Sequence, residues 1–432
     1  MSTQVFTKAK QIPFDASWWE DFVQTTGELK KTTVFKDCLT KEETGKMRGH
    51  LLEALAELDR LRTTQFGYRV FIEGELQGNK GMEEVFDAPP LQDEALDVWA
   101  KRAFGEKKFG IILNRIEKFS PELAQMIALK IKPLLDKVGI PALGVTFTIF
   151  IGNYGWTPIG IHTDGAGENV MHFHLGPGPK TMYTWDWEEY ESKTTAVERL
   201  NNTNIEKHLP DATAFPFEEG DLYFMPEREY HVGKSDDLSI GLTLWFNNHV
   251  KTELTGRALR VITDQYLKDS IEIMEPDTAS VEDCSIFDDS LALMDLPPEL
   301  EKMTFKELLS HAYKDFRYSL YSNAGYWTRP FPMEGTEIEF GLEDYIQLIS
   351  PYKIQYNASE DGTNLQIYVR GSKLILANHP CIANLLDTIN SGKRLRVSAL
   401  METLDPSWDH SIGSYILNMI YTHHGIHYYK AE

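Results

Sequence analysis

Histidine and acidic side chains are concentrated in one short stretch of the sequence, residues 160–180 (GIHTDGAGENVMHFHLGPGPK). The stretch contains an HxD pair, His162 and Asp164, and an HxH pair, His172 and His174, although the 432 residues include only 13 histidines. Because side chains on a strand alternate between two faces, each pair would direct two metal-ligating groups to the same side. Either pair could therefore hold a metal ion, and the two choices imply different chemistry.

A mononuclear iron site needs two histidines and one carboxylate, with the remaining coordination positions open to substrates. His162 and Asp164 supply two such ligands, and the segment 218–233 (EEGDLYFMPEREYHVG) offers His231 as a third. In that segment a turn leads into a short apolar strand that ends at Pro226. Closure of a barrel brings a distant strand beside the first one, so this separation in sequence is compatible with one site.

The strands that would position these ligands begin near residue 144. Residues 144–152 (GVTFTIFIG) are β-branched and aromatic, as in a buried strand, and strands resume at 215–226 (FPFEEGDLYFMP) and 238–246 (LSIGLTLWF). Alternating strands joined by Gly, Pro and Asp turns indicate an antiparallel barrel or sandwich. The polar segment from about 186 to 213 shows no strand pattern and is predicted to be an insertion.

The HxD pair, the later GDLYFMP segment and its distal histidine resemble the jumonji C-type (JmjC) cupin oxygenases, which use Fe(II) and 2-oxoglutarate. The resemblance covers residues 140 to 250 approximately. It implies a double-stranded β-helix barrel in which His162, Asp164 and His231 bind the iron. It also implies that Lys180 binds the far carboxylate of 2-oxoglutarate, a group that needs a cation if it is buried in an apolar barrel.

Three further positions of the resemblance would contact the co-substrate. A threonine just before the HxD corresponds to Thr157, Asn169 follows the HxD, and Thr243 stands where the family often has an asparagine on the last strand. Threonine can still donate a hydrogen bond from that position. These three residues and Lys180 form the expected co-substrate site.

The HxH pair is the rival metal site. Small cupins bind metal through HxH on one strand and a later GDxxxxP…H, but they also have a glutamate shortly after HxH, and LGPGPKTMY has none. If Asn169 faces the pocket, as the resemblance implies, strand alternation places Met171 and Phe173 inward as well. His172 and His174 are then expected on the opposite face.

The chain as a whole is expected to be α+β and to have four parts. Thr304 and Glu307 predict a capping box at the start of a helix, and the last 80 or so residues run as hairpin, three short helices and strand, which resembles a winged helix. The parts are a mainly helical N-terminal region (1–140), the JmjC/cupin catalytic core (141–250), a helical connecting or dimerisation segment (251–340) and a winged-helix-like domain (341–432).

Composition excludes several classes of function. A formal charge of −22 disfavours a general nucleic-acid binder, which needs a basic face. Three scattered cysteines disfavour a disulfide framework and fit a reducing compartment. The N-terminus lacks the apolar stretch of a signal peptide, and no apolar run is long enough to span a membrane. A cytoplasmic protein without membrane or nucleic-acid partners is expected.

The leading hypothesis is an Fe(II)- and 2-oxoglutarate-dependent dioxygenase that uses O₂ to hydroxylate an unactivated C–H bond. The JmjC-like barrel followed by a winged-helix-like domain is similar to peptide- and protein-hydroxylating members of the family, so an amino-acid side chain in a peptide or protein is the expected substrate, and a homodimer is compatible with this layout. The alternatives are a metal cupin that acts on a small molecule or free amino acid, and a non-enzymatic winged-helix regulator with a degenerate barrel.

Overall fold

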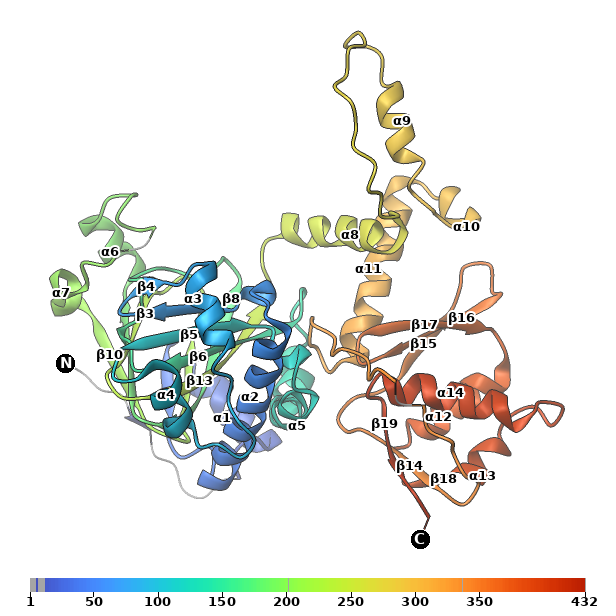
Figure 1. Cartoon of the computed structure of the whole chain (residues 1–432), viewed down its shortest axis with the longest axis horizontal. Helices are drawn as coiled ribbons and strands as arrows, with labels where there is room; N and C mark the ends of the chain where they lie inside the picture. The colour runs from blue at the N-terminus through green and yellow to red at the C-terminus, as the bar shows by residue number, and fades with distance from the viewer. Residues whose placement is uncertain (1–4, 7–11, 201, 336, 432) are drawn as a thin grey trace.

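Two β-sheets form the N-terminal body of the protein in the computed structural model, which describes residues 5–6, 12–200, 202–335 and 337–431 (Figure 1). The nine-stranded sheet has the order β1-β2-β11-β8-β13-β6-β5-β3-β4, and the four-stranded sheet has the order β10-β9-β12-β7. All strand pairs in these sheets are antiparallel except β1 with β2. The strands are β1 (Val5–Phe6), β2 (Thr33–Phe35), β3 (Arg69–Ile72), β4 (Glu75–Leu76), β5 (Phe109–Asn114), β6 (Val145–Gly152), β7 (Gly155–Trp156), β8 (Glu168–Pro177), β9 (Lys180–Trp185), β10 (Thr213–Phe217), β11 (Leu222–Met225), β12 (Tyr230–Ser235) and β13 (Ser239–Asn247). The antiparallel arrangement predicted for residues 144–246 is confirmed.

An apolar cluster between the two sheets shows that they face each other. Val170 of β8 and Tyr223 of β11, from the large sheet, pack with Phe217 of β10 and Met182 of β9, from the small sheet. Residues with this orientation therefore line an interior, which we call the barrel interior. The opposite side of the large sheet belongs to a different cluster, the main hydrophobic core.

Helices cover that opposite side of the large sheet. Leu51, Leu55 and Leu58 are buried in the main core, as their helical spacing predicts. The helix over residues 121–138 is capped by Ser120, whose side chain accepts from the Leu123 N–H. The helices of this region are α1 (Ala16–Thr25), α2 (Lys41–Leu61), α3 (Asn79–Phe86), α4 (Leu96–Phe104) and α5 (Pro121–Val138), with short 3-10 turns η1 (Gln65–Gly67) and η2 (Ile116–Lys118). The N-terminal region also adds strands at both edges of the large sheet, because β2 lies beside β11 and β5 lies beside β6.

The polar insertion after β9 is helical. It contains α6 (Trp187–Lys193), α7 (Ile205–His208) and the 3-10 turn η3 (Leu209–Asp211) before β10 begins. Asp186 starts α6, where its carboxylate accepts from the Glu189 N–H.

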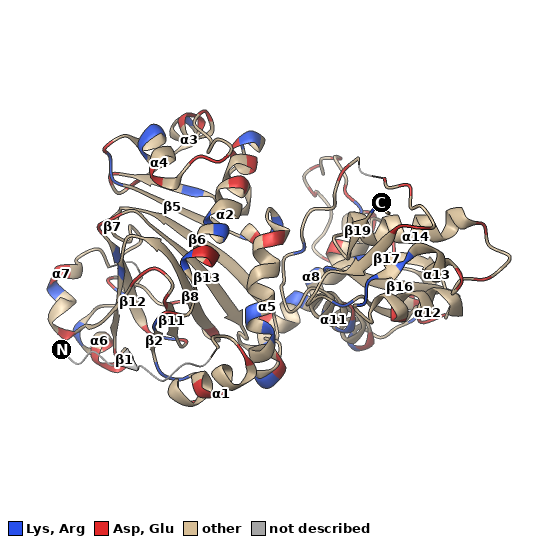
Figure 2. Ribbon diagram, turned by 90° about the horizontal axis from the view of Figure 1, so that it is seen from below, with Lys and Arg blue, Asp and Glu red and all other residues tan. Residues whose placement is uncertain are grey.

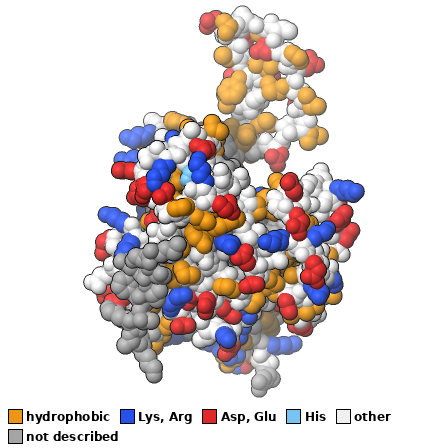
Figure 3. All heavy atoms as spheres, turned by 90° about the vertical axis from the view of Figure 1, so that its left-hand side faces the viewer, with side chains coloured by type: hydrophobic (Ala, Val, Ile, Leu, Met, Phe, Trp, Pro, Cys, Tyr) orange, Lys and Arg blue, Asp and Glu red, His pale blue; other side chains and the backbone are white. Residues whose placement is uncertain are grey.

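Two helices, α8 (Lys251–Tyr266) and α11 (Phe305–Ser322), connect the body to the C-terminal part (Figure 1). They pack through a small apolar cluster that includes Val261 and Phe316. The predicted capping box of Thr304 and Glu307 starts α11. Between them, residues 268–294 project from the molecule with hydrophobic and acidic side chains exposed (Figure 3). This segment carries α9 (Ser285–Leu291), and α10 (Pro298–Glu301) follows it.

The C-terminal part has its own hydrophobic core, built from residues 340–426. The predicted order of hairpin, three short helices and strand is confirmed as β16-β17, α12-α13-α14 and β19. Its elements are β14 (Tyr345–Leu348), β15 (Gln355–Ala358), β16 (Asn364–Val369), β17 (Ser372–Ala377), α12 (Pro380–Ile389), β18 (Leu395–Arg396), α13 (Val397–Met401), α14 (His410–Thr422) and β19 (Ile426–Tyr429), in sheets ordered β18-β14-β19 and β15-β16-β17. In the part of the chain that the structure describes, none of the helices has the length and apolarity needed to cross a membrane.

Candidate metal centre and barrel interior

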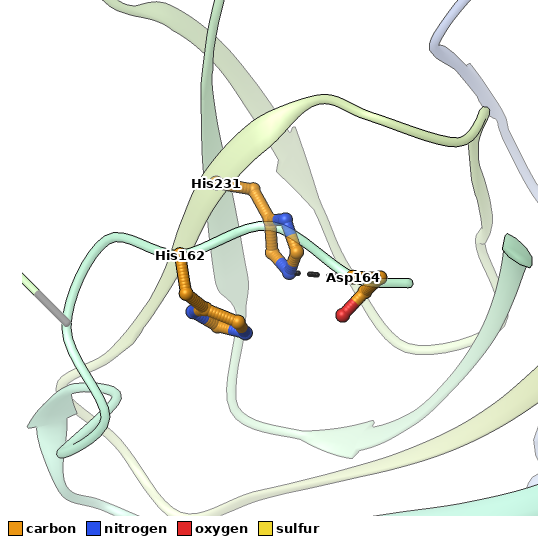
Figure 4. Close-up of side chains that lie close together, drawn as sticks. All are labelled: His162, Asp164 and His231. Atoms are coloured by element: carbon orange, nitrogen blue, oxygen red, sulfur yellow. Dashed lines mark ion pairs between the residues drawn. The ribbon is translucent and has the colours of Figure 1, made fainter. Parts of the chain in front are cut away.

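The structure brings His162, Asp164 and His231 together (Figure 4). One ligating atom from each lies within 4.8 Å of the others, and within the described ranges these residues form the one group of His, Cys or acidic side chains with this geometry. The spacing of the HxD pair had suggested a regular strand, but the pair does not lie on one. His162 makes an isolated bridge, and Asp164 follows it in the loop before β8.

Backbone pairing fixes the two histidines relative to each other. His162 and His231 exchange both of their backbone hydrogen bonds, with N···O distances of 3.2 and 2.9 Å. The Nδ1 atom of His162 lies 2.8 Å from the Gly160 carbonyl oxygen, and the Nδ1 atom of His231 lies 3.0 Å from the Glu229 carbonyl oxygen. When Nδ1 carries the proton and donates it to these carbonyls, each Nε2 keeps a free lone pair, which is the form that binds a metal.

The electrostatics of this group also fit a cation. Burial lowers the pKa of His162 and of His231 to about 4, so both imidazoles are neutral at pH 7. Burial raises the pKa of Asp164 to about 7, and its Oδ2 atom has no hydrogen-bond partner although it lies 3.8 Å from the His231 Nε2. A buried carboxylate without a partner is costly, and a divalent cation between it and two neutral imidazoles would offset that cost. The three residues therefore fit a metal such as Fe(II).

A cavity of about 480 Å³ opens beside these ligands and provides room for a substrate. His162 and Asp164 line one side, and Thr148, Phe150 and Trp245 line it from strands of the large sheet. The cavity thus connects the candidate metal centre with the barrel interior.

Lys180 is a buried cation in this interior. Only 5% of its surface is exposed, although it is the first residue of β9. Its Nζ atom donates to the Tyr154 hydroxyl at 2.9 Å and lies 5.1 Å from the centre of the Phe150 ring. Among the described residues no carboxylate lies within ion-pair distance of it. A buried ammonium group with no acidic partner fits the carboxylate of a ligand.

Thr157 lies next to this lysine. Its hydroxyl donates to the Gly233 carbonyl oxygen at 3.0 Å. A Cβ atom added to Gly233 would lie 3.0 Å from both the Lys180 Cε and the Thr157 Oγ1, so a side chain there would crowd both residues. Glycine at this position therefore leaves space beside the lysine and Thr157.

His172 and His174 face the barrel interior, so the prediction that they lie on the opposite face was wrong. The Nδ1 atom of His172 lies 2.8 Å from the Thr243 hydroxyl, and both imidazoles pack against Phe217. Burial, reinforced by the positive charge of Lys180, lowers the pKa of His172. The Nε2 atom of His172 and the Nδ1 atom of His174 are buried without hydrogen-bond partners.

Asn169 accordingly lies on the outer face of β8, and its expected place in the pocket was also wrong. Its Oδ1 atom accepts from the Glu227 N–H at 2.9 Å, and with Met171 it lines a separate cavity outside the barrel. The physical reason is that the outer face of the large sheet is covered by helices. Met171 and Phe173 are buried there in the main core, so the apolar face of β8 is the outer one.

Tyr154 is a site residue that sequence reasoning missed as a partner of Lys180. It belongs to the turn between β6 and β7, and its ring is adjacent to Gly110 and Gly152, where an added Cβ atom would lie within 3.0 Å of it. The glycines at 110 and 152 thus accommodate the ring, but their significance is visible only in the folded chain.

Comparisons with known proteins give structural neighbours only. No protein-family model matches the chain, and no curated protein matches its sequence. The structure is similar to the X-ray structure of E. coli YcfD, with 14% sequence identity, coverage of 99% of this chain and 100% of that chain, and a TM-score of 0.49. It is similar to the ribosomal oxygenase YcfD from Escherichia coli in complex with cobalt and 2-oxoglutarate, with 14% identity, coverage of 95% and 98%, and a TM-score of 0.47. The α-ketoglutarate-dependent carbocyclase SnoK from nogalamycin biosynthesis matches 57% of this chain and 93% of its own, with 14% identity and a TM-score of 0.35.

Proposed function

We propose that this protein is an Fe(II)- and 2-oxoglutarate-dependent oxygenase that hydroxylates an unactivated C–H bond of a peptide or protein side chain. One observation carries the proposal. A His-Asp-His cluster lies beside a cavity lined by Phe150, and Lys180, which is buried and has no ion pair among the described residues, lies against the same ring. A metal and a dicarboxylate ligand together would satisfy both groups.

The reaction would convert 2-oxoglutarate, O₂ and a C–H bond into succinate, CO₂ and a C–OH group. Fe(II), when bound, supplies the redox chemistry that couples decarboxylation of the oxoacid to insertion of one oxygen atom into the substrate. No proton-transferring pair is required from the protein. The work of the chain is therefore binding, orientation and exclusion of water.

The residues of the barrel divide that work. His162, Asp164 and His231 would hold the metal, and two backbone hydrogen bonds keep the two imidazoles paired. Lys180 would bind the far carboxylate of 2-oxoglutarate, with Thr157 beside it. Thr243 would orient the imidazole of His172, whose Nε2 atom has no hydrogen-bond partner among the described residues. Asn169 has no role in binding the co-substrate in this proposal.

We further propose that the two facing sheets form the double-stranded β-helix of the JmjC type. The N-terminal helices, α1 to α5, then support its outer face, α8 and α11 form the connecting or dimerisation segment, and the C-terminal part is a winged-helix-like domain. The large opening beside the metal centre supports a macromolecular substrate, because a side chain of a peptide can enter while its backbone stays outside.

The test is succinate formation. Purified protein is incubated with Fe(II), O₂, 2-oxoglutarate and a candidate peptide mixture, and succinate is measured for the wild type, for His162→Ala and for the surface control His50→Ala. We expect succinate from the wild type and the control, and none from His162→Ala. Equal succinate from the wild type and His162→Ala would overturn the proposal.

Lys180→Ala separates this oxygenase from a metal cupin that needs no 2-oxoglutarate. The oxygenase proposal predicts that Mn(II) binding is kept, while the affinity for 2-oxoglutarate measured by calorimetry falls by at least about 30-fold, the cost of removing one partner of a buried charge pair. Unchanged 2-oxoglutarate affinity in this variant would contradict the assignment of Lys180.

A further inference from the structure

A second cavity lies between the N-terminal body and the C-terminal part. Its volume is about 580 Å³, and it is lined by residues of α8, α11, the segment 327–329 and the strands β16 and β17. Arg115 and Trp327 line both this cavity and the one beside the metal ligands. The two cavities therefore adjoin at these two residues, and together we call them the groove.

The groove gathers six Lys and Arg side chains and five carboxylates in a protein whose formal charge is −22. Figure 2 shows Lys and Arg positions on α8 and α11, where the barrel and the C-terminal part meet. Asp264, Glu299 and Asp315 also line the groove, and Asp164 and Glu168 line its end at the metal centre, so the excess of positive charge is small. Its cationic side chains are Arg69, Arg115, Lys118, Arg257, Arg329 and Lys373.

Most of these cations lack an acidic partner. Lys373 makes an ion pair with Asp315 at 2.9 Å, whereas no ion pair is found within the described ranges for the other five. The Nε atoms of Arg69 and Arg257 are buried and make no hydrogen bond. Instead, the Arg257 guanidinium lies over an aromatic ring, 4.6 Å from the centre of Trp327. A buried guanidinium nitrogen without an acceptor is costly, and a ligand carboxylate would satisfy it.

The cations also repel one another. Burial lowers the pKa of Lys118, and the nearby charges of Arg329 and Arg115 lower it further. The pKa of Arg257 is also lowered, mainly by burial and in part by the charge of Arg115, while Asp264 acts in the opposite direction. Like charges gathered without compensation reduce the stability of the folded chain, and a bound anion removes that repulsion.

We propose that the groove binds an acidic segment of a peptide or protein substrate and so presents a neighbouring side chain to the metal centre. This inference rests on the proposed oxygenase function and names its substrate class. A peptide fits better than a nucleic acid, because the cations alternate with carboxylates such as Asp264 and Glu299 and with aromatic rings, whereas a nucleic acid presents an unbroken row of phosphates that needs a uniformly basic surface. Guanidinium groups in the groove match carboxylates in bidentate geometry.

The experiment measures binding directly and needs no turnover. Fluorescence anisotropy is recorded with a labelled 12-residue peptide of Gly, Ser and Glu, with the same peptide carrying Lys in place of Glu, and with a 12-nucleotide single-stranded DNA, all at one salt concentration. The variant is Arg115→Glu/Arg329→Glu, since both side chains are exposed and their replacement leaves the core intact. The matched control, Lys80→Glu/Lys107→Glu, makes the same change in charge at exposed positions outside the groove.

We expect the wild type and the control to bind the Glu peptide more tightly than the Lys peptide, and the groove variant to lose about tenfold or more in affinity for it. The milder Arg115→Gln/Arg329→Gln should give a smaller loss, and thermal melts check that both variants fold. Equal binding of the Glu and Lys peptides, an unchanged affinity in the groove variant, or tighter binding of the DNA would overturn the inference. Absence of 2-oxoglutarate binding with an intact Glu-peptide preference would instead count against the oxygenase proposal alone.

Discussion

The two faces of β8 have opposite characters although their residues alternate along one strand. The outer face carries Met171, Phe173 and Leu175, all fully packed in the main core under the helices. The inner face carries His172 and His174, which are equally buried but retain ring nitrogens without hydrogen-bond partners. The apolar outer face needs no ligand, whereas the inner face leaves buried ring nitrogens without partners among the described residues.

This difference shows how a buried surface built for stability differs from one built for binding. Buried polar atoms in proteins are nearly always hydrogen-bonded, so a cluster of unsatisfied ones marks a place where a ligand or ordered water belongs. The barrel interior collects such atoms from Asp164, His172, His174, Tyr223 and Trp245. Substitutions on the outer face should therefore change stability alone, and substitutions on the inner face should change binding.

The largest expected effect on stability is on the outer face. Phe173→Ala should lower the free energy of unfolding by about 3–5 kcal/mol, because it leaves a cavity in the main core. Urea denaturation measures the loss, and the matched control Phe305→Ala, at an exposed ring, should stay within about 0.5 kcal/mol of the wild type. Mn(II) affinity of the folded Phe173→Ala protein should be unchanged; a large loss of metal binding would break the distinction between the two faces.

Asp164→Ala should have the opposite effects, a loss of metal affinity without a loss of stability. We expect Mn(II) affinity to fall by at least about 100-fold, more than is typical for loss of a group that only orients a ligand. In the metal-free protein at pH 8 the same variant should be more stable than the wild type, on the order of 1 kcal/mol, because it removes a buried carboxylate that has no hydrogen bond to its Oδ2 atom. Asp97→Ala, at an exposed position, serves as the control for both measurements. A metal-free Asp164→Ala protein that is much less stable would show that the carboxylate has a structural role.

The smallest effect is expected at Thr243. Thr243→Val keeps the shape of the side chain but removes the hydroxyl bonded to the His172 Nδ1, which should cost about 1 kcal/mol of stability. The affinity for 2-oxoglutarate measured by calorimetry should fall by a few-fold, since His172 loses its orientation. Thr243→Ser keeps the hydroxyl and should behave as the wild type. If Thr243→Val lowered stability without any change in 2-oxoglutarate affinity, the inner face would contribute less to the co-substrate site than proposed.

Several parts of this structure follow from local sequence. Thr304 starts the helix that it was expected to start, because a side-chain oxygen that accepts from a free N–H acts over three residues, and Ser120 caps α5 in the same way. The antiparallel strands from residue 145 onward follow from β-branched and aromatic patterning in the same way. The grouping of His162 and Asp164 with His231 was also anticipated, from the HxD spacing and from the resemblance of the later GDLYFMP segment and its distal histidine to the JmjC oxygenases.

Short-range patterns in the chain are enough to predict which elements form and which ligands are available. Which face of β8 lies inside depends on long-range packing, because alternation fixes that Asn169 and His172 lie on opposite faces but not which face the helices cover. The partner of Lys180 and the groove likewise depend on the fold. Tyr154, Arg115, Arg257 and Arg329 lie far apart in the chain and meet their neighbours only when the sheets and helices pack.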